Sequence, residues 1–313
     1  MDFDTHVCTV ATDEEKAEKL FTSAKRQKVN LINLGKGVKW EGGTMEGQGG
    51  GHKINLVKEY IKDKKDSDVL LFLDGYDTFL SDSTDEIISR YIEFSHRIVF
   101  SSERFCWPDE LIGSDLKALN TDQSTPYQYL NSGVYIGRIG ELKKLFAEPI
   151  ENYEDDQLYV QKQLLKGECD IVCDVEGYMF STHEPQITKR KGQLFNPITK
   201  CYTCAYHGNG GEDAKVILNN IYQRFYGEPI ITYSSSSVYE KISDDMLLID
   251  FMSADMCKKM ISLSETYTFK SLSYDKVKGQ ELRLREFGLW DELEEHWNTN
   301  CLLYTSPSPR DTG

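Results

Sequence analysis

Two aspartates that follow an apolar segment are the residues in this sequence best suited to metal chemistry. Residues 69–73 are Val-Leu-Leu-Phe-Leu, and Asp74-Gly-Tyr-Asp77 comes directly after them. Such an unbroken apolar run predicts a strand buried on both faces, and ligands of parallel sheets bind at the carboxyl ends of strands. Two carboxylates placed there can hold Mg²⁺ or Mn²⁺ and leave positions open for the phosphate oxygens of a ligand. The alternative is an ordinary Asp-Gly turn.

A second candidate lies far along the chain, at His207-Gly-Asn-Gly210 with Lys215 close behind. A histidine nitrogen can complete a Mn²⁺ site that already has two carboxylates. Glycines let backbone N–H groups approach a phosphate, and a lysine can neutralise a diphosphate. The alternative is that the histidine is only a loop residue.

Two further segments offer contacts to a sugar. Residues 105–108, Phe-Cys-Trp-Pro, form an aromatic loop suited to stacking on a sugar face, although Trp107 could instead be a buried core residue. The pair Asp155 and Asp156 could stabilise the positive charge of an oxocarbenium-like transition state or accept a proton from an attacking hydroxyl. The alternative for this pair is structural, because carboxylates at the first turn of a helix suit its dipole.

The elements that would position these residues alternate between strand and helix, which favours an α/β fold with a mostly parallel sheet. Two capping boxes, Thr12 with Glu15 and Ser83 with Glu86, predict helix starts. Residues 130–137 predict a turn that feeds a buried strand. The remaining predicted elements are strands at 6–11, 29–34 and 97–101, a glycine-rich loop at 35–51, and helices that include 54–61, 142–146 and a segment opened by residues 154–157.

Composition excludes several classes of function. The 313 residues carry a formal net charge of −15 and contain no basic block, which argues against a nucleic-acid partner. No apolar run approaches the roughly 20 residues of a membrane span, and the first residues lack the pattern of a signal peptide. Eight cysteines are too few and too scattered for a disulfide framework. Cys201-x-x-Cys204 could be half of a zinc site, a local disulfide or two free thiols.

Five motifs in order resemble the glycosyltransferase domain of the procollagen lysyl hydroxylases, which is related to the collagen galactosyltransferases. The resemblance covers residues 5–225. It implies a GT-A fold, which is a Rossmann-like α/β sandwich, and a UDP-sugar donor, UDP-glucose or UDP-galactose, bound through Mn²⁺ or Mg²⁺. The motifs are Asp-x-x-Asp at 74–77, Phe-Ser-Ser-Glu-Arg-Phe-Cys-Trp-Pro at 100–108, Tyr-Leu-Asn-Ser-Gly-Val-Tyr-Ile-Gly at 129–137, Asp-Asp-Gln at 155–157 and His-Gly-Asn-Gly at 207–210.

Carried over position by position, the resemblance implies a role for each matching residue. It assigns Asp74, Asp77 and His207 to the metal ion. The other implied contacts are Tyr76 stacked on the uracil ring, Val10 and Thr12 in the nucleotide pocket, Lys53, Asn209, Gly210 and Lys215 at the donor phosphates and sugar, Trp107 as a gate of the sugar site, and Asn131, Asp155 and Asp156 at the transferred sugar or its acceptor.

The last quarter of the chain has a different character. Residues 1–230 are predicted to form the glycosyltransferase domain, and 231–238, which include a run of serines, a linker. Residues 239–300 resemble the entry of a 2-oxoglutarate/Fe(II) oxygenase domain. After His207 only His296 remains, so the two histidines and one carboxylate of an iron site cannot be assembled there. That fragment is therefore predicted to be a small, incomplete and inactive domain, and 301–313 a disordered tail.

The leading hypothesis is a metal-dependent transferase that moves a hexose from a UDP-sugar to hydroxylysine, or to galactosyl-hydroxylysine, of collagen-like chains. One alternative is an accessory domain of a full-length procollagen-lysine 5-dioxygenase. Another is a glycan- or collagen-binding module without turnover. The family resemblance suggests the lumen of the endoplasmic reticulum, whereas the absence of a signal peptide in this sequence leaves the compartment open.

Overall fold

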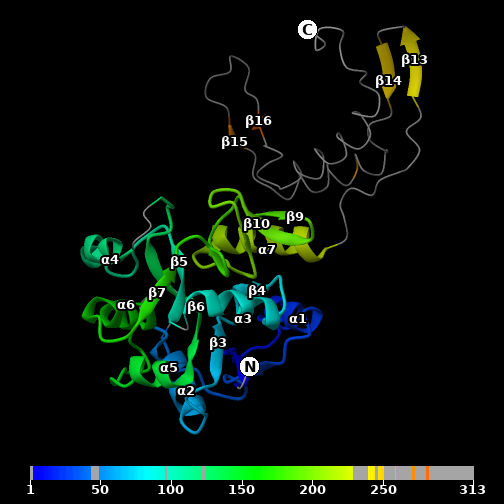
Figure 1. The fold of residues 1–313 in the computed structure, drawn as a ribbon. Coiled ribbons are helices and arrows are strands. Elements are labelled where there is room, and N and C mark those ends of the chain that lie inside the picture. Colours follow the sequence, from blue (N-terminus) through cyan, green and yellow to red (C-terminus); the bar gives the residue numbers. More distant parts are fainter. Residues whose placement is uncertain are drawn as a thin grey trace. The chain divides into compact units, whose positions relative to one another are not determined.

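The computed structural model describes residues 3–43, 49–95, 97–120 and 124–227, and short pieces of the chain beyond them. The chain divides into two compact units, Met1–Phe225 and Tyr226–Gly313 (Figure 1). The first unit is built on a six-stranded sheet and carries all of the predicted site residues. The strands of this sheet are β1 (Thr5–Thr9), β2 (Leu31–Asn33), β3 (Val69–Leu73), β5 (Ile98–Glu103), β6 (Tyr129–Arg138) and β7 (Ile171–Asp174).

The strand order of the sheet is β2-β1-β3-β6-β5-β7. Strand β1 is parallel to β2 and to β3, and β5 is parallel to β7. Only β6 runs antiparallel to both of its neighbours. The predicted α/β class with a mostly parallel sheet is therefore confirmed. Strand β3 is buried along its whole length, as its unbroken apolar run predicts.

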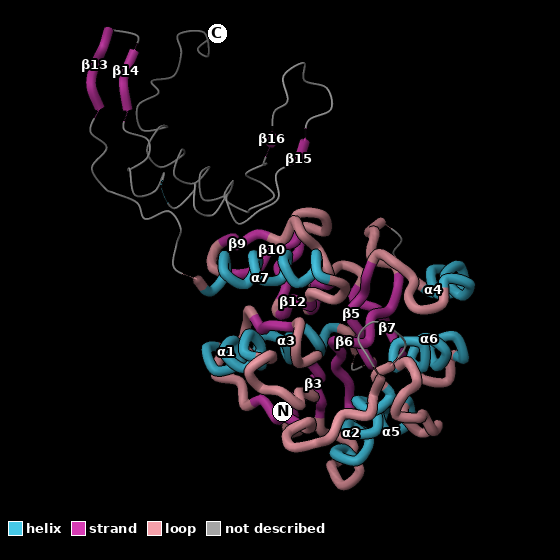
Figure 2. The backbone as a smooth tube through the Cα atoms, turned by 180° about the vertical axis from the view of Figure 1, so that it is seen from behind, coloured by secondary structure: helices cyan, strands magenta, loops and turns pink. Residues whose placement is uncertain are grey.

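Helices cover both faces of the sheet, so the strand side chains alternate between two cores (Figure 2). Leu70 and Phe72 pack with helices α2, α5 and α6, whereas Val69, Leu71 and Leu73 pack with α1 and α3. The helices of the first unit are α1 (Glu18–Arg26), α2 (Gly51–Ile61), α3 (Thr84–Glu93), the short η1 (Glu110–Ile112), α4 (Gly113–Leu119), α5 (Ile139–Leu145), α6 (Asp156–Lys166) and α7 (Glu212–Tyr226).

Two small sheets complete the first unit. In one of them β12 lies between β4, to which it is antiparallel, and β8, to which it is parallel. This sheet begins four residues after Asp74 and ends at His207, so it links the two distant parts of the predicted site. The small sheets contain β4 (Thr78–Leu80), β8 (Phe180–Thr182) and β12 (Ala205–His207), and β9 (Thr188–Arg190), β10 (Gln193–Asn196) and β11 (Cys201–Thr203).

One of the two predicted capping boxes is wrong. Helix α1 begins at Glu18, and its N-cap residue, Ala17, makes no side-chain cap. The backbone N–H of Thr12 instead donates to the Tyr76 hydroxyl, which holds this segment against the loop after β3. At α3 the Ser83 hydroxyl accepts from the Glu86 N–H, as the second box predicts.

Residues 131–133 form part of strand β6, although the sequence predicts a turn that feeds a strand. The pairing with β5 jumps along β6 here, because Phe100 lies opposite Tyr135 and Ser101 opposite Asn131. Residues 132–134 therefore bulge out of the ladder with β5, while Val134 still pairs with Leu73 of β3 and the Gly133 carbonyl accepts from the Asp74 N–H. Turn-forming residue types mark this irregularity correctly, but they do not end the strand.

Four short strands lie in the second unit, and most of that unit is outside the described residues. The predicted linker, oxygenase-like fragment and tail at 231–313 thus remain predictions. No helix in the described part of the chain combines the length and hydropathy of a membrane span. Cys201 and Cys204 are free thiols. The four strands are β13 (Tyr239–Ser243), β14 (Met246–Ile249), β15 (Lys270–Ser271) and β16 (Gln280–Glu281).

The buried carboxylate of Asp174 stabilises the turn after β7. Its Oδ1 accepts from the Tyr178 N–H, and its Oδ2 accepts from the N–H groups of Met179 and Phe180. We expect Asp174→Ala to lower the free energy of unfolding by about 3 kcal/mol, because two buried N–H groups and one partly buried N–H group lose their acceptor. Urea unfolding at neutral pH measures this.

Asp170→Ala is the matched control for that experiment, since the Asp170 side chain is largely exposed and only pairs with Arg97. This control should change stability by no more than about 0.5 kcal/mol. An Asp174→Ala protein as stable as the control would show that the turn does not depend on the carboxylate.

Candidate metal centre and donor site

Three predicted metal ligands converge at the edge where β3 and β12 end. Asp74 follows β3, Asp77 precedes β4, and His207 is the last residue of β12. The antiparallel pairing of β4 with β12 places His207 opposite Thr78, and the Gly208 N–H donates to the Asp77 carbonyl at 2.7 Å. One ligand atom from each of the three side chains lies within 4.8 Å of the other two. The prediction that these distant residues meet is confirmed.

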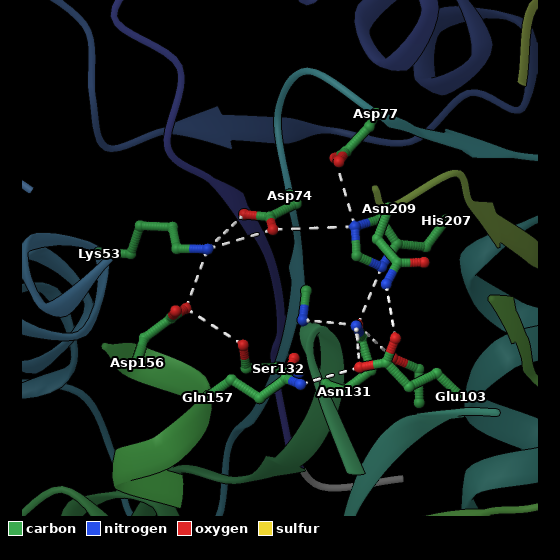
Figure 3. A network of polar contacts seen from close by, with 12 residues as sticks. Lys53, Asp74, Asp77, Glu103, Asn131, Ser132, Asp156, Gln157, His207 and Asn209 are labelled. Atoms are coloured by element: carbon green, nitrogen blue, oxygen red, sulfur yellow. Dashed lines mark hydrogen bonds and ion pairs between the residues drawn. The ribbon is translucent and has the colours of Figure 1, made fainter. Parts of the chain in front are cut away.

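The orientation of the His207 ring is set by Asn131. The Asn131 Oδ1 must be an acceptor, because the backbone N–H of Gly133 donates to it at 3.0 Å. His207 Nδ1 lies 2.9 Å from the same oxygen and therefore carries the proton of that hydrogen bond. In the neutral imidazole the lone pair is then on Nε2, which faces the two aspartates (Figure 3).

A divalent cation fits this set of donors. His207 Nε2 is buried and lacks a well-aligned hydrogen bond, although it lies 3.3 Å from Asp77 Oδ1 and 3.8 Å from Asp74 Oδ2. A buried lone pair without a donor is costly, and a metal ion would satisfy it. Two carboxylates and one imidazole are ligands that Mn²⁺ and Mg²⁺ accept, the imidazole favouring manganese. The metal assignment therefore rests on an unmet bonding capacity as well as on proximity.

The charges of the three groups depend strongly on one another. Burial raises the pKa of Asp74, and the charge of Lys53 only partly offsets this. Burial also opposes ionisation of Asp77, but the nearby His207 outweighs it and lowers the pKa of that carboxyl. Burial would lower the pKa of His207, yet Asp77 and Asp74 raise it. The two carboxylates thus favour a positive charge next to His207 Nε2, which a bound metal ion would supply.

We expect Asn131→Leu to weaken Mn²⁺ binding by about 10- to 100-fold, the usual cost of losing a partner that orients a metal ligand. Leucine has a similar size but cannot accept the Nδ1–H of His207. Titration calorimetry with MnCl₂ measures the affinity. Ser101→Ala is a suitable control, because the Ser101 hydroxyl donates to Asn131 without contacting the ring. Equal affinities of the two variants would contradict the role of Asn131.

Lys53 links the metal centre to the acidic start of α6. Its Nζ lies 2.9 Å from Asp74 Oδ1 and 2.9 Å from Asp156 Oδ2 (Figure 3). Burial would lower the pKa of Lys53, but Asp156 and Asp74 together raise it, so the amine is charged. The Ser132 hydroxyl also donates to Asp156. The contact of Lys53 with donor phosphates remains a prediction, and the structure places its charge at the metal site.

The predicted acid pair separates into two different environments. Asp155 is the N-cap of α6, where its Oδ1 accepts from the Leu158 N–H at 2.7 Å. Asp156 instead faces Lys53 and lies against Gly50, whose φ is +102°. A Cβ on Gly50 would lie 2.4 Å from Asp156 Oδ1, so only glycine leaves this carboxylate in place. Asp156 is thus the member of the pair that points into the site.

Glu103 is a site residue that the sequence interpretation missed. This buried carboxylate accepts from Asn131, Gln157 and Asn209, at 3.2, 2.8 and 2.8 Å (Figure 3). Burial raises its pKa, and the three amide donors offset part of that effect. The sequence did contain a sign of this role, because Glu103 ends the buried strand β5 and lies inside the 100–108 motif. Gln157 was missed in the same way, although it follows the acid pair.

Tyr76, which is assigned to the expected nucleotide pocket, is held in place through its hydroxyl group. The Tyr76 hydroxyl accepts from the N–H groups of Thr12 and Asp13, at 2.9 and 3.2 Å. The ring is held by its hydroxyl and remains partly exposed, as stacking on a base requires. Val10 is buried in the core beside α2. Whether Val10 and Thr12 line a nucleotide pocket remains a prediction.

The remaining predicted residues differ in their exposure and in their contacts. Asn209 contacts Glu103, and Gly210 has a φ of +122° that suits glycine. Lys215 is exposed on α7. Trp107 is exposed, which excludes the alternative of a buried core tryptophan, and its carbonyl accepts from Gln157 and Gln161. The roles implied for these four residues remain predictions.

The fold and the centre define an α/β protein with a candidate divalent-metal site at the edge of its sheet. A family model described as the PLOD GT domain matches residues 2–228. The chain therefore belongs to the glycosyltransferase-domain family of the procollagen lysine hydroxylases. The match covers the first structural unit and ends where the second begins.

Several curated proteins are similar to this chain over the same region. A procollagen-lysine,2-oxoglutarate 5-dioxygenase of Drosophila melanogaster is 34% identical over 220 residues, which are 65% of this chain and 30% of that protein. A multifunctional procollagen lysine hydroxylase and glycosyltransferase of Caenorhabditis elegans is 30% identical and covers 65% of this chain and 30% of its own length. The chain thus spans less than a third of these two relatives.

One further relative and one solved structure were found. An uncharacterized protein, R699, of Acanthamoeba polyphaga mimivirus is 31% identical over 63% of this chain and 43% of its own length. A glycosyltransferase involved in glycosylation of the major capsid of PBCV-1 is 10% identical, covers 69% of this chain and 98% of its own, and has a TM-score of 0.38.

Proposed function

We propose that this domain transfers a hexose from UDP-glucose or UDP-galactose to hydroxylysine, or to galactosyl-hydroxylysine, of a collagen-like chain. The observation that carries the proposal is the convergence of Asp74, Asp77 and the His207 Nε2 lone pair. A metal ion held by these groups would stabilise the diphosphate leaving group as a Lewis acid. The family assignment supports the same class of reaction.

The surrounding residues would contact the donor and the acceptor at different places in the site. Tyr76 offers a partly exposed ring to a base, in contact with Thr12. Lys53 carries a positive charge beside Asp74, where the donor phosphates would approach a bound metal ion. Asp156 lies on the other side of Lys53 and presents a carboxylate that could hydrogen-bond a sugar hydroxyl. These placements support a site open to donor and acceptor at one edge of the sheet.

A second function has support from the names of the relatives. Two of them, from Drosophila melanogaster and Homo sapiens, are called procollagen-lysine,2-oxoglutarate 5-dioxygenases. In a longer protein of that kind this domain would accompany an oxygenase. Transfer activity of the domain itself distinguishes the first function from the second.

The test is a transfer assay on the purified chain. We expect Mn²⁺-dependent release of UDP from one UDP-hexose, with formation of a glycosylated product from free hydroxylysine or galactosyl-hydroxylysine. The Asp74→Ala, Asp77→Ala double variant should lose this activity by more than about 1,000-fold, because the leaving group loses its Lewis acid. Asp63→Asn, an exposed carboxylate just after α2, is the control.

Two results would refute the proposal. One is a wild-type chain that releases no UDP from either donor in the presence of Mn²⁺ and both acceptors. The other is a double variant that turns over as fast as the control. Acceptor binding without any dependence on UDP or Mn²⁺ would favour a binding module instead.

A further inference from the structure

The loop after β5 exposes an unusual amount of apolar surface. Phe105 is 68% exposed, Trp107 is 56% exposed and Leu111 is 90% exposed. These three side chains lie within seven residues: Phe105 and Trp107 are on the loop between β5 and η1, and Leu111 is in η1. We name them the 105–111 patch. Large apolar side chains exposed together in one short segment are typical of a surface that binds another molecule.

The backbone of this loop is well anchored, so its exposed side chains do not result from a loose segment. The Trp107 carbonyl accepts from the side-chain amides of Gln157 and Gln161, at 2.8 and 2.9 Å. The Asp109 carboxylate accepts from the Leu111 N–H and begins η1. The chain thus orders the loop with polar contacts while its apolar side chains face outward. Such a preformed surface loses little conformational entropy when it binds a partner.

Gln157 connects the backbone of the patch to the residues of the reaction site. The same amide that donates to the Trp107 carbonyl also donates to Glu103 Oε1, at 2.8 Å. Gln157 follows Asp156, and its Oε1 accepts from the Ser132 N–H (Figure 3). The backbone that carries the patch therefore lies one glutamine side chain away from the residues around Asp156. This is the place where an acceptor hydroxyl must enter if the proposed function is correct.

The charges around the patch select among possible partners. Glu110 and Asp115 are exposed beside it. The guanidinium of Arg104, which precedes the loop, is paired with the buried Glu184. These charges do not suit a phosphate-rich ligand such as the nucleotide donor. They do suit a polypeptide with apolar rings and basic side chains.

We propose that the 105–111 patch docks the polypeptide part of the acceptor, and that this polypeptide is a proline-rich chain in an extended polyproline II conformation. Aromatic surfaces recognise such chains because the conformation is preformed and presents proline rings at regular intervals. The inference rests on the proposed function, since it assigns the acceptor side of that site. It adds a binding surface for the residues that flank the modified lysine. The metal centre alone does not explain how those residues would be bound.

The test compares two acceptors on the same enzyme. One is free hydroxylysine, and the other is a proline-rich peptide of Gly-X-Y repeats that contains a single hydroxylysine. We expect Phe105→Ser and Leu111→Ser each to raise the KM for the peptide by about tenfold, since each removes a large apolar contact. The KM for free hydroxylysine and the metal-dependent hydrolysis of the UDP-hexose without acceptor should stay unchanged. Val216→Ser, which removes another exposed apolar side chain on α7, should change none of these values.

The possible outcomes separate this inference from the proposed function. If the wild-type chain transfers to neither acceptor, the proposed function fails, and the docking inference that rests on it fails with it. If it transfers to both, but the patch variants keep the wild-type KM for the peptide, the docking surface is refuted. A change from dimer to monomer in Phe105→Ser, with unchanged kinetics, would also refute it and would assign the patch to a second copy of this chain.

The proline preference has its own test. A peptide in which alanine replaces proline should bind wild type and Phe105→Ser alike. If the alanine peptide discriminates between the two proteins as the proline peptide does, the proline preference is wrong.

Discussion

The Gly133→Ala variant should fold and yet lose Mn²⁺ affinity by more than about 100-fold, because one methyl group removes the space of the His207 ring. A Cβ at this position would lie 2.1 Å from His207 Cε1 and 2.6 Å from Nε2. Real Cβ contacts do not approach so closely, so the ring must move. His207 is buried at the end of β12, and its hydrogen bond to Asn131 breaks when it turns. The lone pair of Nε2 then no longer faces the aspartates.

Gly137→Ala is the control for this experiment. It adds the same methyl group to the same strand, where its nearest contacts would be Ile98 and Leu142 at 3.3 Å. Both variants should be less stable by about 1–3 kcal/mol through overpacking, and urea unfolding verifies that they are folded in the assay. Only Gly133→Ala should lose the metal in a calorimetric titration. Equal loss in both, or in neither, would show that the Gly133 position does not govern the His207 ring.

The Asp77→Asn variant is expected to lose at least about 100-fold in Mn²⁺ affinity while it keeps its local backbone structure. Asparagine has nearly the same shape but removes the charge that faces His207 at 3.3 Å. The Asp77 carbonyl still accepts from the Gly208 N–H, so the link between the two parts of the site remains. The loss would therefore report the carboxylate and not a rearranged loop.

Asp74→Asn is expected to have a broader effect than Asp77→Asn. Asp74 is also a partner of Lys53, which would keep only Asp156 after the substitution. Metal affinity should fall, and the position of Lys53 should change as well. Crystal structures of the two variants, with calorimetry, would separate these effects. Asp63→Asn again serves as the control, and an Asp77→Asn protein with the affinity of this control would falsify the metal assignment.

The parts of this site that could be predicted are those encoded by local patterns. The apolar run at 69–73 predicts both the strand β3 and the position of Asp74 at its end, since a strand buried on two faces leaves little choice of residue type. The convergence of Asp77 with His207 depends on the antiparallel pairing of β4 with β12, across more than a hundred residues. No local pattern contains that pairing. Ligand chemistry only suggested His207 as a partner of the aspartates, and the similarity to a family assigned it.

Other parts of the site were hidden because tertiary contacts outweigh local preference. Asn131 and Gly133 are turn-forming types, yet both lie in β6, where one orients the His207 ring and the other leaves room for it. Thr12 has the side chain of an N-cap but contacts Tyr76 instead. Glu103 resembles an ordinary charged residue in sequence, and its burial among three amides is visible only in three dimensions.

Three consecutive residues of β6 serve the centre in different ways. Asn131 bonds His207, Ser132 bonds Asp156, and the Gly133 carbonyl accepts from the Asp74 N–H. A slip of this strand by one residue would exchange all three positions. Since the unfolded chain has no such arrangement, a cation that binds here selects the correctly registered native sheet and raises its population by mass action. Loading the centre with metal should thus protect β6 against hydrogen exchange, so the reaction site also acts as a clamp on the fold.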